Sequence, residues 1–152
     1  MKKFLSFFLA LTLVFSFSVV LSPQTTHAAT DYCNTGNYLG ASYGYGNVKV
    51  INGNTSNGAC HIQYYHLAAP GKGSAIVDGQ SKSQFSRDLS RSEMATIAGA
   101  VVSGGTNTKL SNGNYKAEAF NISVNQYVRV IYYNKVENGT TYKMVVTMYP
   151  YK

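Results

Sequence analysis

QYVRVIYY (residues 126–133) and TTYKMVVTMY (residues 140–149) form the most regular part of the sequence, because polar and apolar side chains alternate along both runs. Side chains on a β-strand point to opposite faces of the sheet with a period of two. Both runs therefore predict strands, and the mostly polar residues 134–139 predict a turn between them. Together they predict an antiparallel hairpin near the C-terminus.

The second run predicts one buried face and one polar face. The set expected to face the core is apolar or aromatic throughout: Tyr142, Met144, Val146 and Met148. The opposite set carries an ammonium group, hydroxyl groups and a phenol: Thr141, Lys143, Val145, Thr147 and Tyr149. With Arg129 from the preceding strand, this second face could bind a phosphodiester. The alternative is an ordinary antiparallel sheet with one solvated face.

The clearest helix signal precedes the hairpin. Ser90 and Glu93 match the S-x-x-E pattern of a capping box, in which each side chain accepts a backbone N–H of the first turn. The apolar residues that follow recur at helical spacing: Met94, Ile97, Ala98, Val101 and Val102. Gly104-Gly105 predicts the end of this helix.

The remaining segments carry weaker signals. Residues 60–69 fit a helix that Pro70-Gly71 would end, or alternatively a strand. Short strands are predicted at 48–51 and 115–120. Irregular coil or loop is predicted for 31–47, 71–80 and 103–114. We expect one α+β domain, in which an N-terminal helical and irregular part packs on a C-terminal antiparallel sheet.

Residues 1–28 have the features of a secretory signal peptide. Lys2 and Lys3 form a positive n-region, 4–21 is an apolar run, and small residues up to Ala28 offer a cleavage site. We therefore expect a single mature domain over 29–152 that is secreted to the extracellular medium. No membrane attachment is expected after cleavage of the signal.

The expected mature domain is basic and carries two cysteines. Without Lys2 and Lys3, eleven basic and six acidic residues remain, which gives a net charge of +5. A basic protein favours polyanionic partners such as nucleic acids, wall polymers or lipid headgroups. Export makes a disulfide between Cys33 and Cys60 the expected state of the two thiols. A zinc site is not expected, because these two cysteines lack the close spacing of zinc ligands.

Both histidines of the expected mature domain lie in segment 60–69. Five residues separate His61 from His66, which places them about 140° apart around a helix and on opposite faces of a strand. A site that uses both imidazoles therefore requires the chain to bend between them. Cys60 directly precedes His61, so a disulfide would anchor the backbone beside this imidazole.

Three local patterns resemble those of the bacterial EndoU-type endoribonucleases, which occur widely as toxin domains. His61-Ile62-x-Tyr64 is similar to the opening motif of that family. Lys82-Ser83-x-Phe85-x-x-x-Leu89-Ser90 is similar to a second motif, which also precedes a helix. The third pattern is the ending, a Val-Arg-Val-Ile strand (128–131), a turn, and then Val-x-Thr147-x-Tyr149-Pro150.

The resemblance implies that RNA is cleaved by attack of its own 2′-hydroxyl, which leaves a 2′,3′-cyclic phosphate and requires no cofactor and no metal. Histidine can transfer the two protons, and lysine can stabilise the developing oxyanions. The implied catalytic residues are His61, His66, Lys82, Thr147 and Tyr149. The implied substrate-binding residues are Ser83, Arg129 and Lys143. The implied partners are RNA and a cognate immunity or inhibitor protein.

The sequence also departs from the family pattern. Ser86 and Leu89 stand where the family usually has Pro and Trp, and the second catalytic histidine of the family usually lies further downstream than His66. A histidine pair five residues apart is also similar to related bacterial toxins with an RNase A-like fold, which share the Thr-x-Tyr-Pro ending. The alternative function is a non-catalytic secreted binding module, on a degenerate nuclease scaffold or on an unrelated one.

Overall fold

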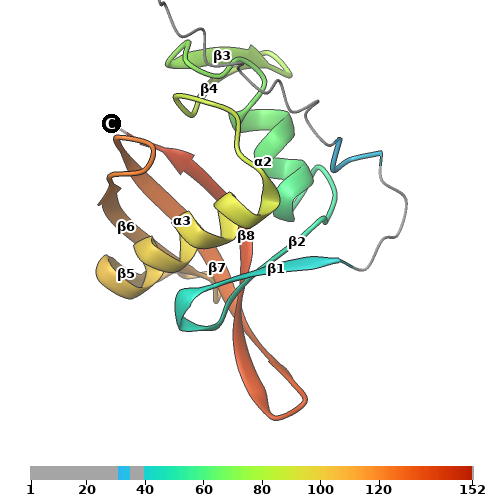
Figure 1. Ribbon diagram of the computed structural model, residues 1–152, viewed down its shortest axis with the longest axis vertical. Helices are drawn as coiled ribbons and strands as arrows, with labels where there is room; N and C mark the ends of the chain where they lie inside the picture. Colours follow the sequence, from blue (N-terminus) through green and yellow to red (C-terminus); the bar gives the residue numbers. More distant parts are fainter. Residues whose placement is uncertain (1–30, 35–39, 152) are drawn as a thin grey trace, which may run out of the picture.

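A computed structural model of the chain describes residues 31–34 and 40–151. Over these residues, two α-helices pack with a six-stranded sheet, and a separate two-stranded hairpin lies beside them (Figure 1). The fold therefore belongs to the predicted α+β class. The predicted signal peptide at 1–28 lies outside the described residues.

The large sheet is mixed: its C-terminal strands pair antiparallel, as predicted, and one parallel pair is added to them. Its strand order is β1-β2-β8-β7-β6-β5. β2 runs parallel to β8, whereas the other neighbouring pairs are antiparallel. Local sequence patterns do not record the relative direction of strands as distant in the chain as β2 and β8. The strands are β1 (Ala41–Gly44), β2 (Val48–Ile51), β5 (Thr106–Lys109), β6 (Tyr115–Asn121), β7 (Gln126–Glu137) and β8 (Thr140–Pro150).

β7 and β8 form the predicted hairpin, but both strands are longer than predicted. Only Asn138 and Gly139 remain in the turn. Their φ angles are 49° and 76°, as a two-residue type I′ turn requires, and Asn-Gly is the usual sequence for such a turn. The tip of the hairpin projects beyond the rest of the sheet (Figure 1).

A β-bulge changes which side chains of β8 face the core. The pairing register shifts between Ile131 and Tyr132, and this leaves Val146 as the extra residue. After the bulge the predicted alternation is confirmed, because Met148 is fully buried in the core. At and before the bulge the outcome is divided: Val145 joins the core in place of Val146, whereas Met144 is buried as predicted. One extra residue in a strand moves the side chains on one side of it to the opposite face of the sheet. The alternation of polar and apolar residues does not show where such a residue is inserted.

Helix α3 (Arg91–Gly104) covers one face of the sheet. The predicted capping box is confirmed, because Ser90 and Glu93 each accept the other's backbone N–H. The predicted apolar stripe is buried: Met94, Ile97, Ala98, Val101 and Val102. It shares one core cluster with Ala117, Val128 and Val130 of the sheet.

Segment 60–69 was predicted as a helix or alternatively as a strand, and most of it belongs to a helix, α2 (Gly58–His66). It follows β2, which is itself the predicted strand, and packs against β8. β2 pairs with β8 only at Val48 and Lys49, so α2 takes the place beside β8 that β2 leaves. The helix buries Ala59 and Ile62 in the common core.

Three segments predicted as coil or loop contain secondary structure. β1 and a short 3-10 helix, η1 (Tyr45–Asn47), lie within 31–47. The hairpin of β3 (Ser74–Val77) and β4 (Gln80–Ser83) begins within 71–80. β5 lies within 103–114 and is exposed at all four residues, so no apolar period marks it.

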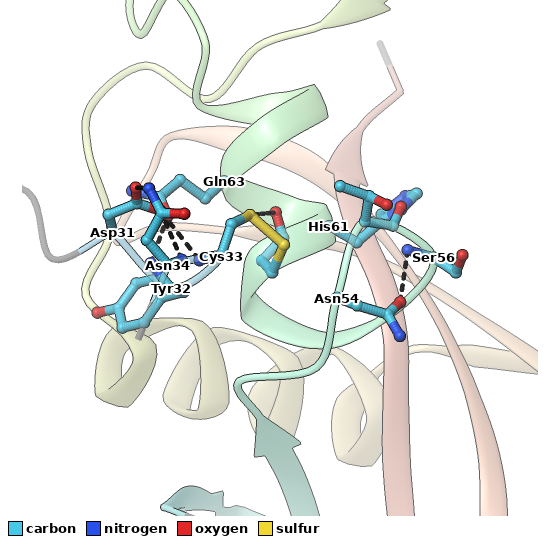
Figure 2. The surroundings of a disulfide bond; sticks show 10 residues. Asp31, Tyr32, Cys33, Asn34, Asn54, Ser56, His61 and Gln63 are labelled. Atoms are coloured by element: carbon cyan, nitrogen blue, oxygen red, sulfur yellow. Dashed lines mark hydrogen bonds between the residues drawn. A yellow bond between two sulfur atoms is a disulfide. The ribbon is translucent and has the colours of Figure 1, made fainter. Parts of the chain in front are cut away.

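The predicted disulfide between Cys33 and Cys60 is confirmed. It joins the segment before β1 to the first turn of α2 (Figure 2). Structural disulfides are typical of proteins exported to oxidising compartments. Across 31–34 and 40–151, none of the helices has the length and apolar character needed to cross a membrane.

Candidate active site

A row of polar and aromatic side chains crosses the face of the sheet opposite α3. The strand register places Glu118 of β6 beside Arg129 of β7, and Arg129 beside Tyr149 of β8. Arg129 Nε donates to Glu118 Oε1 at 2.7 Å, and Nη1 donates to the Tyr149 hydroxyl at 3.3 Å. A hydrogen bond from Lys116, together with Arg129, lowers the pKa of Glu118. These contacts hold the phenol of Tyr149 at the end of β8.

His66, the last residue of α2, continues this row. Its ring stacks on Tyr149, with centroids 5.1 Å apart and planes 21° from parallel. Its Nδ1 lies 2.9 Å from the carbonyl oxygen of Ser83. A carbonyl only accepts hydrogen bonds, so Nδ1 carries the hydrogen and Nε2 is the basic nitrogen of the neutral ring.

The surroundings of His66 keep its imidazole uncharged. The side chain is 6% exposed, and this burial lowers its pKa to about 4, with further lowering by the charges of His61 and Lys82. At neutral pH, His66 therefore offers a lone pair on Nε2 as a proton acceptor.

His61 lies at the other end of the same helix, and its ring centroid is 6.0 Å from that of His66. Its Nδ1 is 2.7 Å from the carbonyl oxygen of Thr55, so it also donates through Nδ1 and keeps Nε2 for proton transfer. Figure 2 shows that His61 leaves α2 on the side away from the disulfide. The two histidines thus have the same tautomer, each fixed by a backbone carbonyl.

The expectation that a regular helix keeps the two imidazoles apart is wrong. Residues five apart differ by about 140° around a helix. Helical side chains, however, lean toward the N-terminal end, and His66 stands at the C-terminal end. Its ring therefore leans back toward His61, with Tyr65 packed 4.7 Å from the His61 ring. No bend of the helix is needed to bring the rings together.

Gln84 is a site residue that the sequence analysis missed. Its side chain is fully buried. Its Nε2 donates to the carbonyl oxygens of Tyr65 and Lys82, and its Oε1 accepts the backbone N–H of Ala69. The amide thereby fixes the end of β4, including the Ser83 carbonyl that orients His66. A Gln in a polar stretch carries no sequence signal of such burial.

The β3–β4 hairpin is attached to α2 through its turn. Asp78 accepts hydrogen bonds from the hydroxyls of Tyr64 and Tyr65, both at 3.0 Å. These hydrogen bonds to Asp78 raise the pKa of both phenols. On β4, Lys82 Nζ lies 5.3 Å from the centre of the Tyr65 ring. The hairpin thus brings a lysine to the helix that carries both histidines.

We call His61, Tyr65, His66, Lys82 and Tyr149 the histidine cluster. Four of them were predicted as catalytic residues, and α2, β4 and β8 bring them together. The predicted residue Arg129 joins the cluster through Tyr149, and Ser83 joins it through its carbonyl group.

Two predicted residues behave differently. The fifth predicted catalytic residue, Thr147, shares a face of β8 with Tyr149, and its buried Oγ1 has no hydrogen-bond partner among the described residues. Lys143 was predicted on that face as well, and this position is wrong. It pairs with Val48, whose side chain is in the core, and its Nζ lies near Gly46 of η1. The bulge at Val146 exchanges the two faces for the residues that precede it in β8, so Lys143 lies on the face opposite to the predicted one.

The chemical groups of the cluster suit proton transfer beside an anion. It combines two imidazoles that keep Nε2 available with one lysine, and Arg129 adds a guanidinium. Among the described residues, no group of three or more His, Cys, Asp or Glu could hold a metal ion.

Comparisons with protein-family models, with curated proteins and with solved structures give no match.

Proposed function

We propose that this chain is a secreted endoribonuclease of the EndoU or RNase A-like type, acting as a toxin or antagonism factor. The observation that carries the proposal is the pair of imidazoles 6.0 Å apart, each with Nδ1 bound to a backbone carbonyl and Nε2 kept for proton transfer. An acid and a base at this separation suit in-line transfer at a phosphodiester, where the two oxygens that exchange protons lie on opposite sides of phosphorus.

The proposed reaction gives each histidine one role. Nε2 of His66 accepts the proton of the ribose 2′-hydroxyl, whose oxygen forms the new bond to phosphorus. The bond from phosphorus to the 5′-oxygen breaks, and His61, which takes part as the imidazolium, protonates that oxygen from Nε2 and is left as the neutral ring. The products are a 2′,3′-cyclic phosphate and a 5′-hydroxyl. Burial lowers the pKa of His66 to about 4, so at neutral pH its ring is the neutral form that a general base requires.

The remaining cations would bind the phosphates of the substrate. Lys82, next to the histidines, would stabilise the charge on the reacting phosphorus, and Arg129, on the far side of Tyr149, would bind a neighbouring phosphate. Fixed cations stabilise a phosphorane more than the ground-state diester, because the charge on its oxygens grows. The reaction needs no metal ion in this scheme.

Incubating the protein with total RNA in the presence of a chelator tests the proposal. We expect fragments that end in 2′,3′-cyclic phosphates, and we expect His61→Ala to produce about 10²–10⁴-fold fewer of them in a given time. Fragments with 3′-hydroxyl ends, or cleavage by His61→Ala at the rate of the unaltered protein, would contradict the proposal.

A second candidate function is a non-catalytic secreted binding module. The observation that favours it is the burial of His66, because a substrate can reach only a small part of this ring. Binding of RNA without cleavage by the unaltered protein, with or without chelator, would support this second function.

A further inference from the structure

An exposed group of aromatic side chains lies next to the row that ends at the histidine cluster. Phe120 and Tyr127 are 50% and 43% exposed, and they face each other across β6 and β7 with ring centroids 5.3 Å apart. Tyr151 extends the group, since its ring centroid is 6.0 Å from that of Tyr127. We call Phe120, Tyr127 and Tyr151 the aromatic platform.

The platform belongs to the same face of the sheet as the proposed active site. The pair of Phe120 and Tyr127 lies two residues along each strand from the pair of Glu118 and Arg129. Residues two apart on a strand share a face. α3 packs on the other face. A role in the core does not account for Phe120 and Tyr127, because about half of each residue contacts solvent.

Arg129 connects the platform to the histidine cluster. Its guanidinium carbon lies 4.8 Å from the ring centre of Tyr151 and 5.6 Å from that of Tyr149. The guanidinium has five N–H donors in a plane, so beyond its bonds to Glu118 and Tyr149 it can still donate to a phosphate oxygen. A cation flanked by aromatic rings matches the alternation of phosphate and base along a single strand of nucleic acid.

We infer that the aromatic platform is a stacking subsite for the base of single-stranded RNA that lies one nucleotide beyond the two nucleotides at the cleaved bond, with Arg129 on the intervening phosphate. The inference rests on the proposed function for the identity of the ligand. Every base has a π-face, so stacking on Phe and Tyr binds a single strand without selecting its sequence. The site would recognise RNA that is unpaired and longer than the two nucleotides at the cleaved bond.

Binding of an uncleavable ligand tests the inference separately from catalysis. The probe is a fluorescent 2′-O-methyl octanucleotide of mixed sequence, whose blocked 2′-oxygens prevent cleavage, and the readout is fluorescence anisotropy at low salt. Loss of a base–aromatic stack in Phe120→Ala or Tyr127→Ala should weaken binding about 5- to 150-fold. Tyr45→Ala is the matched control, because Tyr45 is a tyrosine that is 79% exposed on η1, next to α3.

Cleavage of a dinucleoside phosphate, which is too short to reach the platform, completes the experiment. We expect Tyr127→Ala to cleave it at the rate of the unaltered protein. Thermal unfolding checks each variant, and Phe120→Leu replaces Phe120→Ala if the latter does not fold, with the same loss of binding expected. Unchanged octanucleotide binding in the platform variants would overturn the inference even if the protein cleaves RNA. Weakened binding without cleavage by any form of the protein would uphold the subsite and refute the nuclease.

Discussion

The buried imidazole of His66 couples folding to pH. Its pKa is about 4 in the folded chain and 6.5 in the absence of the fold, so the unfolded chain binds this proton first. The contribution of neutral His66 to stability is complete above pH 6.5 and is lost as the pH falls from 6.5 through 4. We expect urea denaturation to show a loss of about 2 kcal/mol between pH 7 and pH 5.

His66→Gln provides the control for this prediction, because it removes the titrating ring. Glu93 and Glu118 have lowered pKa values, so their contributions to stability are lost below about pH 4.5 and do not mask that of His66. If His66→Gln loses as much free energy of unfolding between pH 7 and pH 5 as the unaltered protein, another group causes the loss.

The hydroxyl of Thr147 gives a second prediction at the residue scale. Its oxygen is buried without a hydrogen-bond partner among the described residues, and such a group costs free energy in the folded state. Thr147→Val has the same shape and should raise the free energy of unfolding by about 1 kcal/mol, as measured in urea. Its neighbour Met148 is fully buried, and Met148→Ala should lower the free energy of unfolding by about 2–5 kcal/mol. Destabilisation by Thr147→Val would mean that the hydroxyl has a partner.

At the scale of elements, the attachment of the β3–β4 hairpin to α2 can be followed through the two phenols that donate hydrogen bonds to Asp78. Asp78→Asn suits this test, because Asp78 has a φ of 50° and Asn tolerates that conformation. Loss of the carboxylate should lower the raised pKa values of Tyr64 and Tyr65, since ionisation then no longer breaks a hydrogen bond to a carboxylate or meets its negative charge. Ultraviolet absorbance titration should then show two tyrosines that ionise at lower pH. An unchanged titration curve would mean that the hairpin is not docked in solution.

The elements that could be predicted from the sequence are those specified by neighbouring residues. The capping box at Ser90 and the alternation in β7 predict a helix and a strand without reference to the rest of the chain. Asp78-Gly79 and Asn138-Gly139 are two-residue hairpin turns, and the Asp-Gly dipeptide is the sequence signal that predicts the hairpin of β3 and β4. The bulge in β8 could not be predicted in this way, because one extra residue is compatible with the same pattern.

The disulfide gives a prediction for the whole molecule. It closes a loop of 27 residues, and on the chain-entropy model it stabilises the fold by roughly 3–4 kcal/mol. We expect the paired replacement Cys33→Ser and Cys60→Ser to lower the free energy of unfolding by this amount. Reduction of the unaltered protein should have the same effect, and reductant should not change the paired variant. Equal stability with and without reductant would contradict the prediction.

Assembly of the histidine cluster is also a property of the whole molecule. The residue types at His61, His66 and Tyr149 could be identified from local motifs, but their proximity depends on α2 lying beside β8. The role of Gln84 depends on three backbone groups that meet only after folding. The positions of His61 and His66 around the helix predicted that their rings lie apart, whereas the direction of the His66 side chain brings the rings together.

In the proposed reaction, His61 acts as the acid of a pair in which His66 is the base. The most direct test compares two substrates of His61→Ala: a dinucleoside phosphate, and a 3′-nucleotide ester of 4-nitrophenol. The nitrophenolate leaves without protonation, whereas the 5′-oxygen of a nucleoside does not. The account predicts a loss of about 10²–10⁴-fold in kcat/KM for the dinucleoside phosphate and little change for the nitrophenyl ester. Equal losses for both substrates, or no loss for either, would contradict it.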